Sequence, residues 1–329
     1  MSKVKKQHYV PQAYLERFTH DGDHLFVYDK FESVVRSANK KDVAEENYFY
    51  NLPEEALPAG EENQEPDRQV VDKEFRKIEG VFNQILGRVI SRAAPKGGGI
   101  FRRVLRVLPF RRKVISRRHR EDLSLLIALQ FMRTREYRET IIEGMRKGRS
   151  AVYEILRRST FPGAKEIPPP PLEFSKSEAA TLHSEFLGNQ NYVEGLTQIL
   201  NGLHYWLIGV NNTSRPLYTS DHPVVRRGHV PNQFLGSSGL ASYGVEIAFP
   251  ISPKFIIILY EKTYFTQVRR MDRRAVELSA ANVSYYNSLQ VANCFRQVYC
   301  NVEDFADAKE FCRRSPEACR RDRSRISVR

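Results

Sequence analysis

The spacing of apolar residues changes along the chain, and this change most constrains the fold. Between residues 67 and 209, apolar side chains recur at every third or fourth position, which is typical of amphipathic helices. Over residues 210–313, short apolar runs are separated by turn residues, which is typical of strands. Residues 1–52 hold a short arm and a predicted hairpin. We therefore predict an α+β fold, with a helical middle packed against a mixed or antiparallel sheet formed by the N-terminal hairpin and the C-terminal strands.

Helices are predicted at several places, including Ser150–Arg158 and a closing helix at Val302–Arg313. Asp67–Ala94 and Arg120–Arg146 each predict one long helix. Ser175–Gly209 predicts a helical pair or one long helix, and Arg273–Leu289 predicts a helix within the strand-rich region. The predicted hairpin strands lie at 24–30 and 33–37.

Length favours one domain. With 329 residues and 41% hydrophobic residues, the chain can bury a large core. We predict a single domain, 1–329, that carries a basic strap at 95–118, a Pro-rich spacer at 168–171 and a basic tail at 314–329.

Neither a membrane span nor a secretory signal is predicted. The longest apolar candidate, Phe249–Tyr260, is interrupted by two prolines and a lysine, and a bilayer requires about 20 apolar residues. The N-terminal lysines are not followed by an apolar stretch. The four cysteines match no zinc spacing, so we expect free thiols in a cytoplasmic protein.

The charge distribution predicts a polyanionic partner. The net charge is +13, and residues 88–120 contain twelve Lys or Arg and no acid. The tail Arg313–Arg329 holds seven arginines against two acids. Clustered arginine of this kind is typical of nucleic-acid binding. The alternative is a basic surface that reflects composition alone.

The N-terminal stretch is the first candidate site. Pro11 holds the residues before it in extended geometry, and Gln12–Phe18 predicts one or two helical turns. His8 and Gln12 would lie on either side of this corner, at the edge of a functional site. The alternative is an arm docked on the core, where His8 makes only a structural hydrogen bond.

Two further places carry candidate residues. Gln130 and Arg133 share a helix face after an apolar stretch, so they either brace a neighbouring element or line a polar pocket. Asp221 ends an apolar strand, and Pro223 restricts the residue between them, His222, to extended backbone geometry. Its carboxylate either points into a cleft or caps a turn through backbone bonds.

Five segments together carry a resemblance to a known family. They are Lys6–Gln12 with the following Tyr14, Leu15 and Phe18; Leu129–Thr134; Ser220–Val224; Phe249–Pro253; and Asn287 leading to Phe295–Tyr299. On these segments, in this order, the chain resembles the domain of unknown function 4238 family over nearly its whole length. The resemblance implies one domain in which the polar motifs converge, but it implies no reaction. The family position held here by His222 is often Asn or Lys, so the resemblance assigns it no catalytic role.

The residues suggest a nuclease that hydrolyses RNA or DNA, with a toxin or phage-defence effector as the expected context. His8 and Asp221 would be catalytic, with His8 as general base or acid. Substrate would be bound by the polar side chains of Gln12, Gln130, Arg133, Arg135 and Asn287. Metal dependence stays open between Mg²⁺, Mn²⁺ and none, and a metal-independent RNase is the simpler mechanism.

Two other functions fit the same residues. One is a non-catalytic subunit that binds nucleic acid or a protein partner in a larger complex. The other is a pocket for a nucleotide or a nucleotide-derived signal. The sequence leaves RNA against DNA, oligomeric state and the convergence of the motifs undecided.

Overall fold

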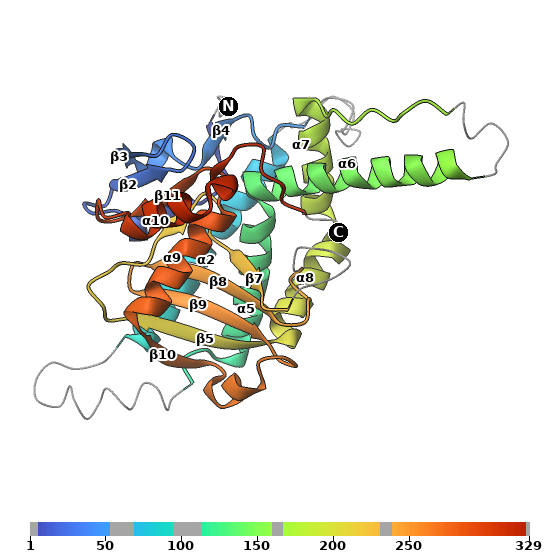
Figure 1. Ribbon diagram of the computed structural model, residues 1–329. Coiled ribbons are helices and arrows are strands. Elements are labelled where there is room, and N and C mark those ends of the chain that lie inside the picture. Colours follow the sequence, from blue (N-terminus) through green and yellow to red (C-terminus); the bar gives the residue numbers. More distant parts are fainter. Residues whose placement is uncertain (1–5, 53–68, 95–112, 160–166, 231–238, 327–329) are drawn as a thin grey trace, which may run out of the picture.

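The protein was analysed as a computed structural model that describes residues 6–52, 69–94, 113–159, 167–230 and 239–326. In these residues, strands form three sheets and most helices fall in the middle of the chain (Figure 1). The predicted α+β class is therefore confirmed. Most of the predicted basic strap, 95–112, lies outside the described residues.

The largest sheet has five strands in the order β10-β5-β9-β8-β7. Neighbouring strands are antiparallel except for β10 and β5, which are parallel. Its strands are β5 (His204–Asn211), β7 (Val225–Gly228), β8 (Val245–Ser252), β9 (Phe255–Glu261) and β10 (Arg274–Leu278).

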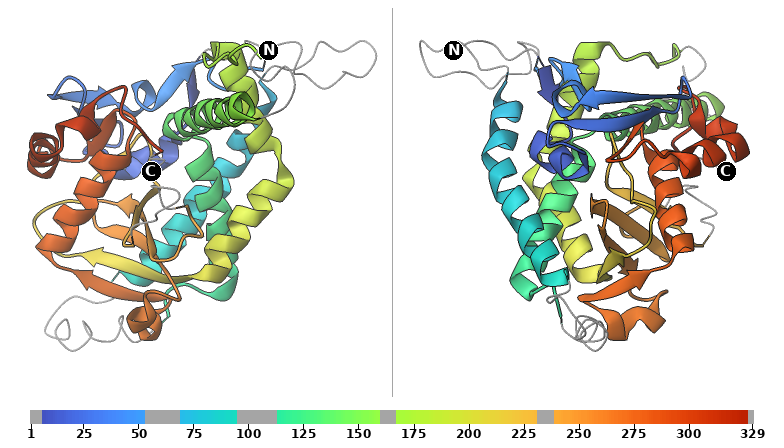
Figure 2. Two further views of the ribbon diagram at one scale, coloured as in Figure 1. Left: turned by 45° about the vertical axis from the view of Figure 1, so that its right-hand side comes forward. Right: turned by 90° about the vertical axis from the view of Figure 1, so that its left-hand side faces the viewer.

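Helices cover both faces of this sheet. Trp206 and Ile208 of β5 belong to the core that includes residues of α2 (Val70–Ala93) and α5 (Arg117–Met132). Leu207, between them, faces the core shared with α9 (Ala280–Asn293). Figure 2 shows α9 and the pair α2 and α5 on opposite sides of the sheet. Because both faces are buried, β5 is a continuous apolar run rather than an alternating one.

The N-terminal hairpin belongs to a second, four-stranded sheet. Its order is β3-β2-β11-β6, with all neighbours antiparallel. The strands are β2 (His24–Asp29), β3 (Val34–Asn39), β6 (Thr219–Ser220) and β11 (Gln297–Cys300). The predicted hairpin therefore pairs with C-terminal strands, as expected. A third, two-stranded sheet joins β1 (Lys6–His8) to β4 (Glu45–Asn47).

The remaining elements are helical. The other α-helices are α1 (Gln12–Leu15), α6 (Arg135–Arg158), α7 (Lys176–Gly188), α8 (Gln190–Leu203) and α10 (Ala306–Arg314). Short 3-10 segments are η1 (Glu16–Phe18), η2 (Lys40–Asp42), η5 (Thr266–Met271) and η6 (Pro316–Cys319). Within the described ranges, no helix is both long and apolar enough to span a bilayer. The four cysteines are free, as predicted.

The single helix predicted for Arg120–Arg146 is wrong. Helix α5 ends at Met132, and α6 begins at Arg135. Thr134 lies between them in extended geometry, and its hydroxyl accepts a hydrogen bond from the Tyr137 N–H. A threonine that caps the next helix in this way competes with continuation of the previous one.

Two helix predictions extended into strands. The helix predicted to reach Gly209 ends at Leu203, where β5 begins. The helix predicted from Arg273 begins at Ala280, after β10, with Ser279 forming a capping box. Short apolar runs buried on both faces carry no periodicity that separates strand from helix, which explains the error at β5.

Gly209 provides a test of the packing between β5, β9 and β10. A Cβ atom at this position would lie 2.6 Å from Cγ2 of Ile256 and 3.0 Å from Cδ2 of Leu278. We expect Gly209→Ala to lower the free energy of unfolding by about 1–3 kcal/mol, measured by urea denaturation, because the core is overpacked.

The matched control is Gly195→Ala in α8, where a Cβ would have no neighbour within 4 Å. This change should be neutral or stabilise the fold by about 0.5–1 kcal/mol through helix propensity. Equal effects of the two substitutions would contradict the close approach at Gly209.

Candidate functional site

The structure brings His8 and Gln12 together at the N-terminal corner. Nε2 of His8 lies 3.1 Å from the Lys41 carbonyl oxygen. The side-chain nitrogen of Gln12 lies 3.4 Å from the ring nitrogens of His8. Burial lowers the pKa of His8, so the imidazole is neutral at pH 7. A neutral imidazole on a half-buried residue is able to accept a proton.

Gln130 and Arg133 hold the N-terminal arm through its backbone. The amide nitrogen of Gln130 donates to the Tyr9 carbonyl at 3.2 Å, and Nη2 of Arg133 donates to the His8 carbonyl at 2.9 Å. The same guanidinium pairs with Glu79 at 3.0 Å and lies over the Phe75 ring. Both predicted substrate-binding side chains are buried and occupied by protein groups.

Asp221 joins two distant segments of the chain. Its carboxylate is 1% exposed and accepts hydrogen bonds at 2.8 Å from the backbone N–H groups of Phe295, Arg296 and Gln297. Burial raises the pKa of Asp221, and these N–H groups act in the opposite direction. The geometry is that of a carboxylate that caps the entry to β11.

Arg135 and Asn287 also make contacts within the protein. Arg135 pairs with Glu46 at 3.2 Å and lies 4.2 Å over the Phe295 ring. Asn287 is buried; its side chain accepts from the Tyr218 N–H at 2.8 Å and donates to Asp307 at 2.9 Å.

The predicted residues therefore fall into separate groups. His8, Gln12, Gln130 and Arg133 form one network around the N-terminal arm. Asp221 caps β11, and among the described residues no hydrogen bond or ion pair joins its side chain to His8. The catalytic assignment of His8 and Asp221 stays a prediction.

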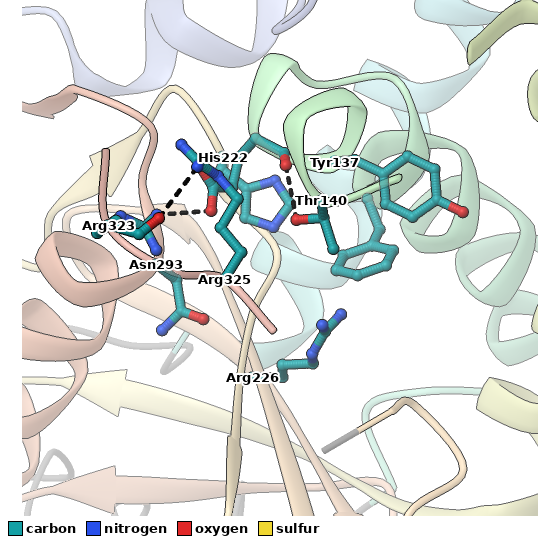
Figure 3. A pocket seen from close by; sticks show the side chains of 9 residues that line it. Tyr137, Thr140, His222, Arg226, Asn293, Arg323 and Arg325 are labelled. Carbon is teal, nitrogen blue, oxygen red and sulfur yellow. Dashed lines mark hydrogen bonds and ion pairs between the residues drawn. The ribbon is translucent and has the colours of Figure 1, made fainter. Parts of the chain in front are cut away.

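A cavity that the sequence did not predict is lined by His222, the residue after Asp221. It has a volume of about 70 Å³, which is room for several water molecules or a group the size of a phosphate. Its walls come from α5, α6, the β6–β7 connection, β7, α9 and the C-terminal residues (Figure 3). The lining residues are Phe131, Glu136, Tyr137, Thr140, His222, Arg226, Asn293, Arg323 and Arg325.

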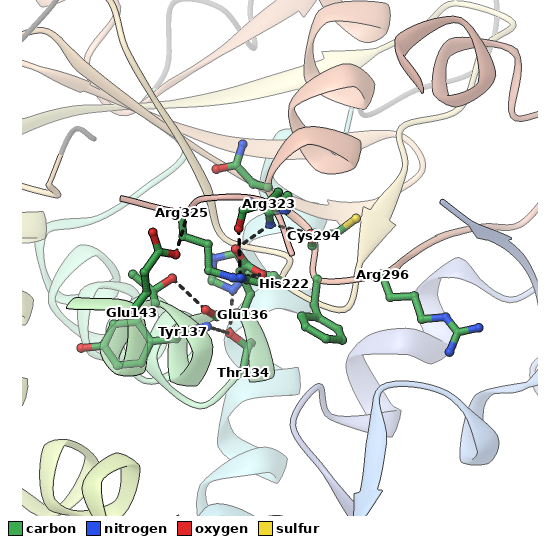
Figure 4. A network of polar contacts seen from close by, with 12 residues as sticks. Thr134, Glu136, Tyr137, Glu143, His222, Cys294, Arg296, Arg323 and Arg325 are labelled. Carbon is green, nitrogen blue, oxygen red and sulfur yellow. Dashed lines mark hydrogen bonds and ion pairs between the residues drawn. The ribbon is translucent and has the colours of Figure 1, made fainter. Parts of the chain in front are cut away.

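The C-terminal wall is held by two glutamates of α6. Glu136 pairs with Arg323 at 2.6 Å and with Arg325 at 3.2 Å (Figure 4). Glu143 accepts a hydrogen bond from the Arg325 N–H at 2.8 Å, and Lys147 pairs with the same carboxylate at 2.6 Å. Two arginines of the predicted nucleic-acid-binding tail are therefore paired within the protein.

Two guanidinium groups at this cavity keep hydrogen-bonding capacity. Arg226 of β7 lies over the Phe131 ring, 5.0 Å from its centroid, and pairs with no carboxylate among the described residues. Nε of Arg323 is buried and finds no acceptor in the described part of the chain. Burial lowers the pKa of Arg226, yet a guanidinium stays charged at neutral pH.

His222 lines the cavity as a neutral group. Its Nδ1 lies 2.6 Å from the Thr134 hydroxyl. Burial, with Arg226 and Arg323 nearby, lowers the pKa of His222 to about 3. Burial also raises the pKa of Glu136, while Arg323 and Arg325 lower it. The cavity is therefore cationic, with three guanidinium groups and one carboxylate.

The sequence held only partial signals for this site. His222 follows the Asp221 that was singled out, and Arg323 lies in the basic tail. Glu136 and Arg226 carried no distinguishing pattern, because ordinary charged residues on a helix and a strand acquire a role only when folding brings them together.

The fold and the cavity define an α+β protein with a cationic internal site. The chain belongs to the family described as "Protein of unknown function (DUF4238)", whose model matches residues 6–304. No curated protein and no solved structure matches it. Arg323 and Arg325 lie beyond the matched residues, whereas the other residues that line the cavity lie within them.

A metal ion has no evident set of ligands in the described residues, where no three His, Cys, Asp or Glu side chains are grouped to hold one.

Asp221→Asn separates a structural role from a catalytic one. The amide would turn an N–H donor toward backbone N–H groups, and each buried donor left unpaired costs about 1–3 kcal/mol. We expect a loss of about 2 kcal/mol or more in the free energy of unfolding, measured by chemical denaturation.

The control is Asp23→Ala, which removes an exposed carboxylate that pairs with Lys40 at 3.3 Å. Its expected cost is below about 1 kcal/mol, as for other surface ion pairs. An Asp221→Asn protein as stable as the parent would contradict the structural role.

Proposed function

We propose that the protein binds a phosphate-bearing small ligand of the nucleotide class in the cavity between α6, β7 and the C-terminal residues. The observation that carries this proposal is Arg226, a guanidinium that borders the cavity with no carboxylate partner among the described residues. Arginine suits phosphate because its planar fork donates two parallel hydrogen bonds.

The surrounding groups support the same ligand chemistry. Arg323 adds a buried Nε without an acceptor in the described chain, and Arg325 adds a second charge from the same segment. The hydroxyl of Thr140 already donates to the Glu136 carbonyl at 2.8 Å, so the guanidinium groups are the available donors. The aromatic rings of Phe131 and Tyr137 at the cavity would exclude water and strengthen these contacts.

Arg226→Gln tests the proposal with inorganic phosphate as the probe. A ligand that binds only the folded state stabilises it, by about 2.7 kcal/mol at 100 times its Kd. Phosphate should therefore raise the Tm of the parent protein relative to chloride at equal ionic strength. The same addition should raise the Tm of Arg226→Gln much less.

Arg227→Gln is the matched control, because Arg227 is the next residue of β7, is exposed, and lies over the Tyr285 ring instead. The phosphate-induced rise in Tm should persist in this variant. An equal response in both variants would assign the effect to general surface charge and reject the site.

A nuclease activity is the second candidate function. The observation that favours it is the neutral, half-buried His8 imidazole, which is able to act as a general base. We expect labelled single-stranded RNA, tRNA or duplex DNA to be cleaved by the parent protein and not by His8→Ala. His24→Ala replaces an exposed histidine and should keep the activity.

Parallel reactions with Mg²⁺, Mn²⁺ and EDTA would determine whether metal takes part. Cleavage that survives His8→Ala, or its absence from every reaction, would reject the proposed role of His8.

A further inference from the structure

We infer that the cavity selects a terminal phosphate monoester dianion over a phosphodiester. This inference rests on the proposed function, because it names the form of phosphate that the same site accepts. It follows from the charge of the cavity, the directions from which its donors come, and its size.

The charge of the cavity matches two negative charges. The guanidinium groups of Arg226, Arg323 and Arg325 are opposed by the Glu136 carboxylate alone, and the other lining residues are neutral. The site therefore has a net charge of about +2 at neutral pH. A phosphate monoester carries about −1.5 to −2 charges at pH 7, whereas a diester carries only one.

The guanidinium groups come from two different walls. Arg226 projects from β7, and Arg323 enters from the C-terminal segment (Figure 3). The Nη2 atom of Arg323 already donates to Glu136 and to the Cys294 carbonyl, and its buried Nε has no acceptor among the described residues. A terminal phosphoryl group has three non-bridging oxygens with which to meet both walls. A diester has two, and carries a substituent on each side.

The size of the cavity adds a steric reason. About 70 Å³ accommodates one phosphate-sized group. Walls from α5, α6, β7, α9 and the C-terminal segment line this space. A diester would have to fit a second substituent beside the phosphate group. The remainder of the ligand would therefore lie outside the cavity.

The test compares methyl phosphate with dimethyl phosphate by isothermal titration calorimetry on the full chain at pH 7.5. These probes differ in charge and in one methyl group. Methyl phosphate should bind roughly tenfold tighter or more, since the loss of one charge–charge contact of this kind costs over about 1.4 kcal/mol. Arg226→Gln should lose most of this preference, while Arg227→Gln should keep it.

Lowering the pH from 7.5 to 5 provides an independent readout. The second pKa of a phosphate monoester is about 6, so only about a tenth remains dianionic at pH 5. Sulfate stays a dianion and so reports any change in the cavity itself, including protonation of Glu136, whose pKa is raised by burial. The monoester affinity should therefore fall roughly tenfold relative to the sulfate affinity. The pKa of His222, lowered to about 3, keeps this side chain neutral across the range.

The outcomes separate the two proposals. Equal affinities for the monoester and the diester, or a monoester affinity that does not change with pH relative to the sulfate affinity, would overturn the selectivity and leave phosphate binding intact. No binding of inorganic phosphate, methyl phosphate or sulfate would overturn the proposed function and the selectivity with it.

Discussion

The capping of β11 by Asp221 is the interaction on which the candidate site depends. One carboxylate satisfies three successive N–H groups, so it fixes the end of β6 against the segment that follows α9. His222 comes next in the chain, and the same connection leads into β7 and Arg226. The Asp221 N–H also donates to the Gln297 carbonyl at 3.0 Å, so the two segments hold each other in register. The residue that the sequence suggested as catalytic thus positions the wall of the cavity.

Buried polar side chains also hold the backbone of the N-terminal arm in place. A chain terminus is usually frayed unless other groups hold it. Here the buried side chains of Gln130 and Arg133 bond to its backbone carbonyls, and the Tyr50 hydroxyl donates to the Arg133 carbonyl at 2.7 Å. These contacts also satisfy the buried side chains, since a buried polar group without a partner costs about 1–3 kcal/mol of stability. Docking of the N-terminal arm therefore accounts for the polar residues of this network, independently of any chemistry that His8 performs.

Local patterns predicted the elements well where periodicity was clear. The hairpin, the long helix α2 and the strands β8 and β9 follow from alternation, three-and-four spacing and turn residues. The pattern failed for β5, whose apolar run is buried on both faces, and at Thr134, where one capping hydroxyl divides two helices. Of the candidate residues, only the partial burial of Gln130 was predictable from the preceding apolar stretch. The cavity was not, since its charged residues come from distant segments whose pairing depends on tertiary contacts.

The free-energy cost of the charged groups buried around the cavity is the strongest reason to assign the cavity a function. Burying a guanidinium removes it from water, and well-packed apolar residues of similar volume often stabilise a fold more than buried charges do. Arg323 and Arg325 recover part of this cost through Glu136, but Arg226 has only the Phe131 ring among the described residues. Structure alone gives no reason to keep a third cation beside one carboxylate. The proposed anionic ligand would supply the missing partner, and it would stabilise the C-terminal segment that contributes the other two cations. Binding at this site should therefore be coupled to the order of residues that follow α10.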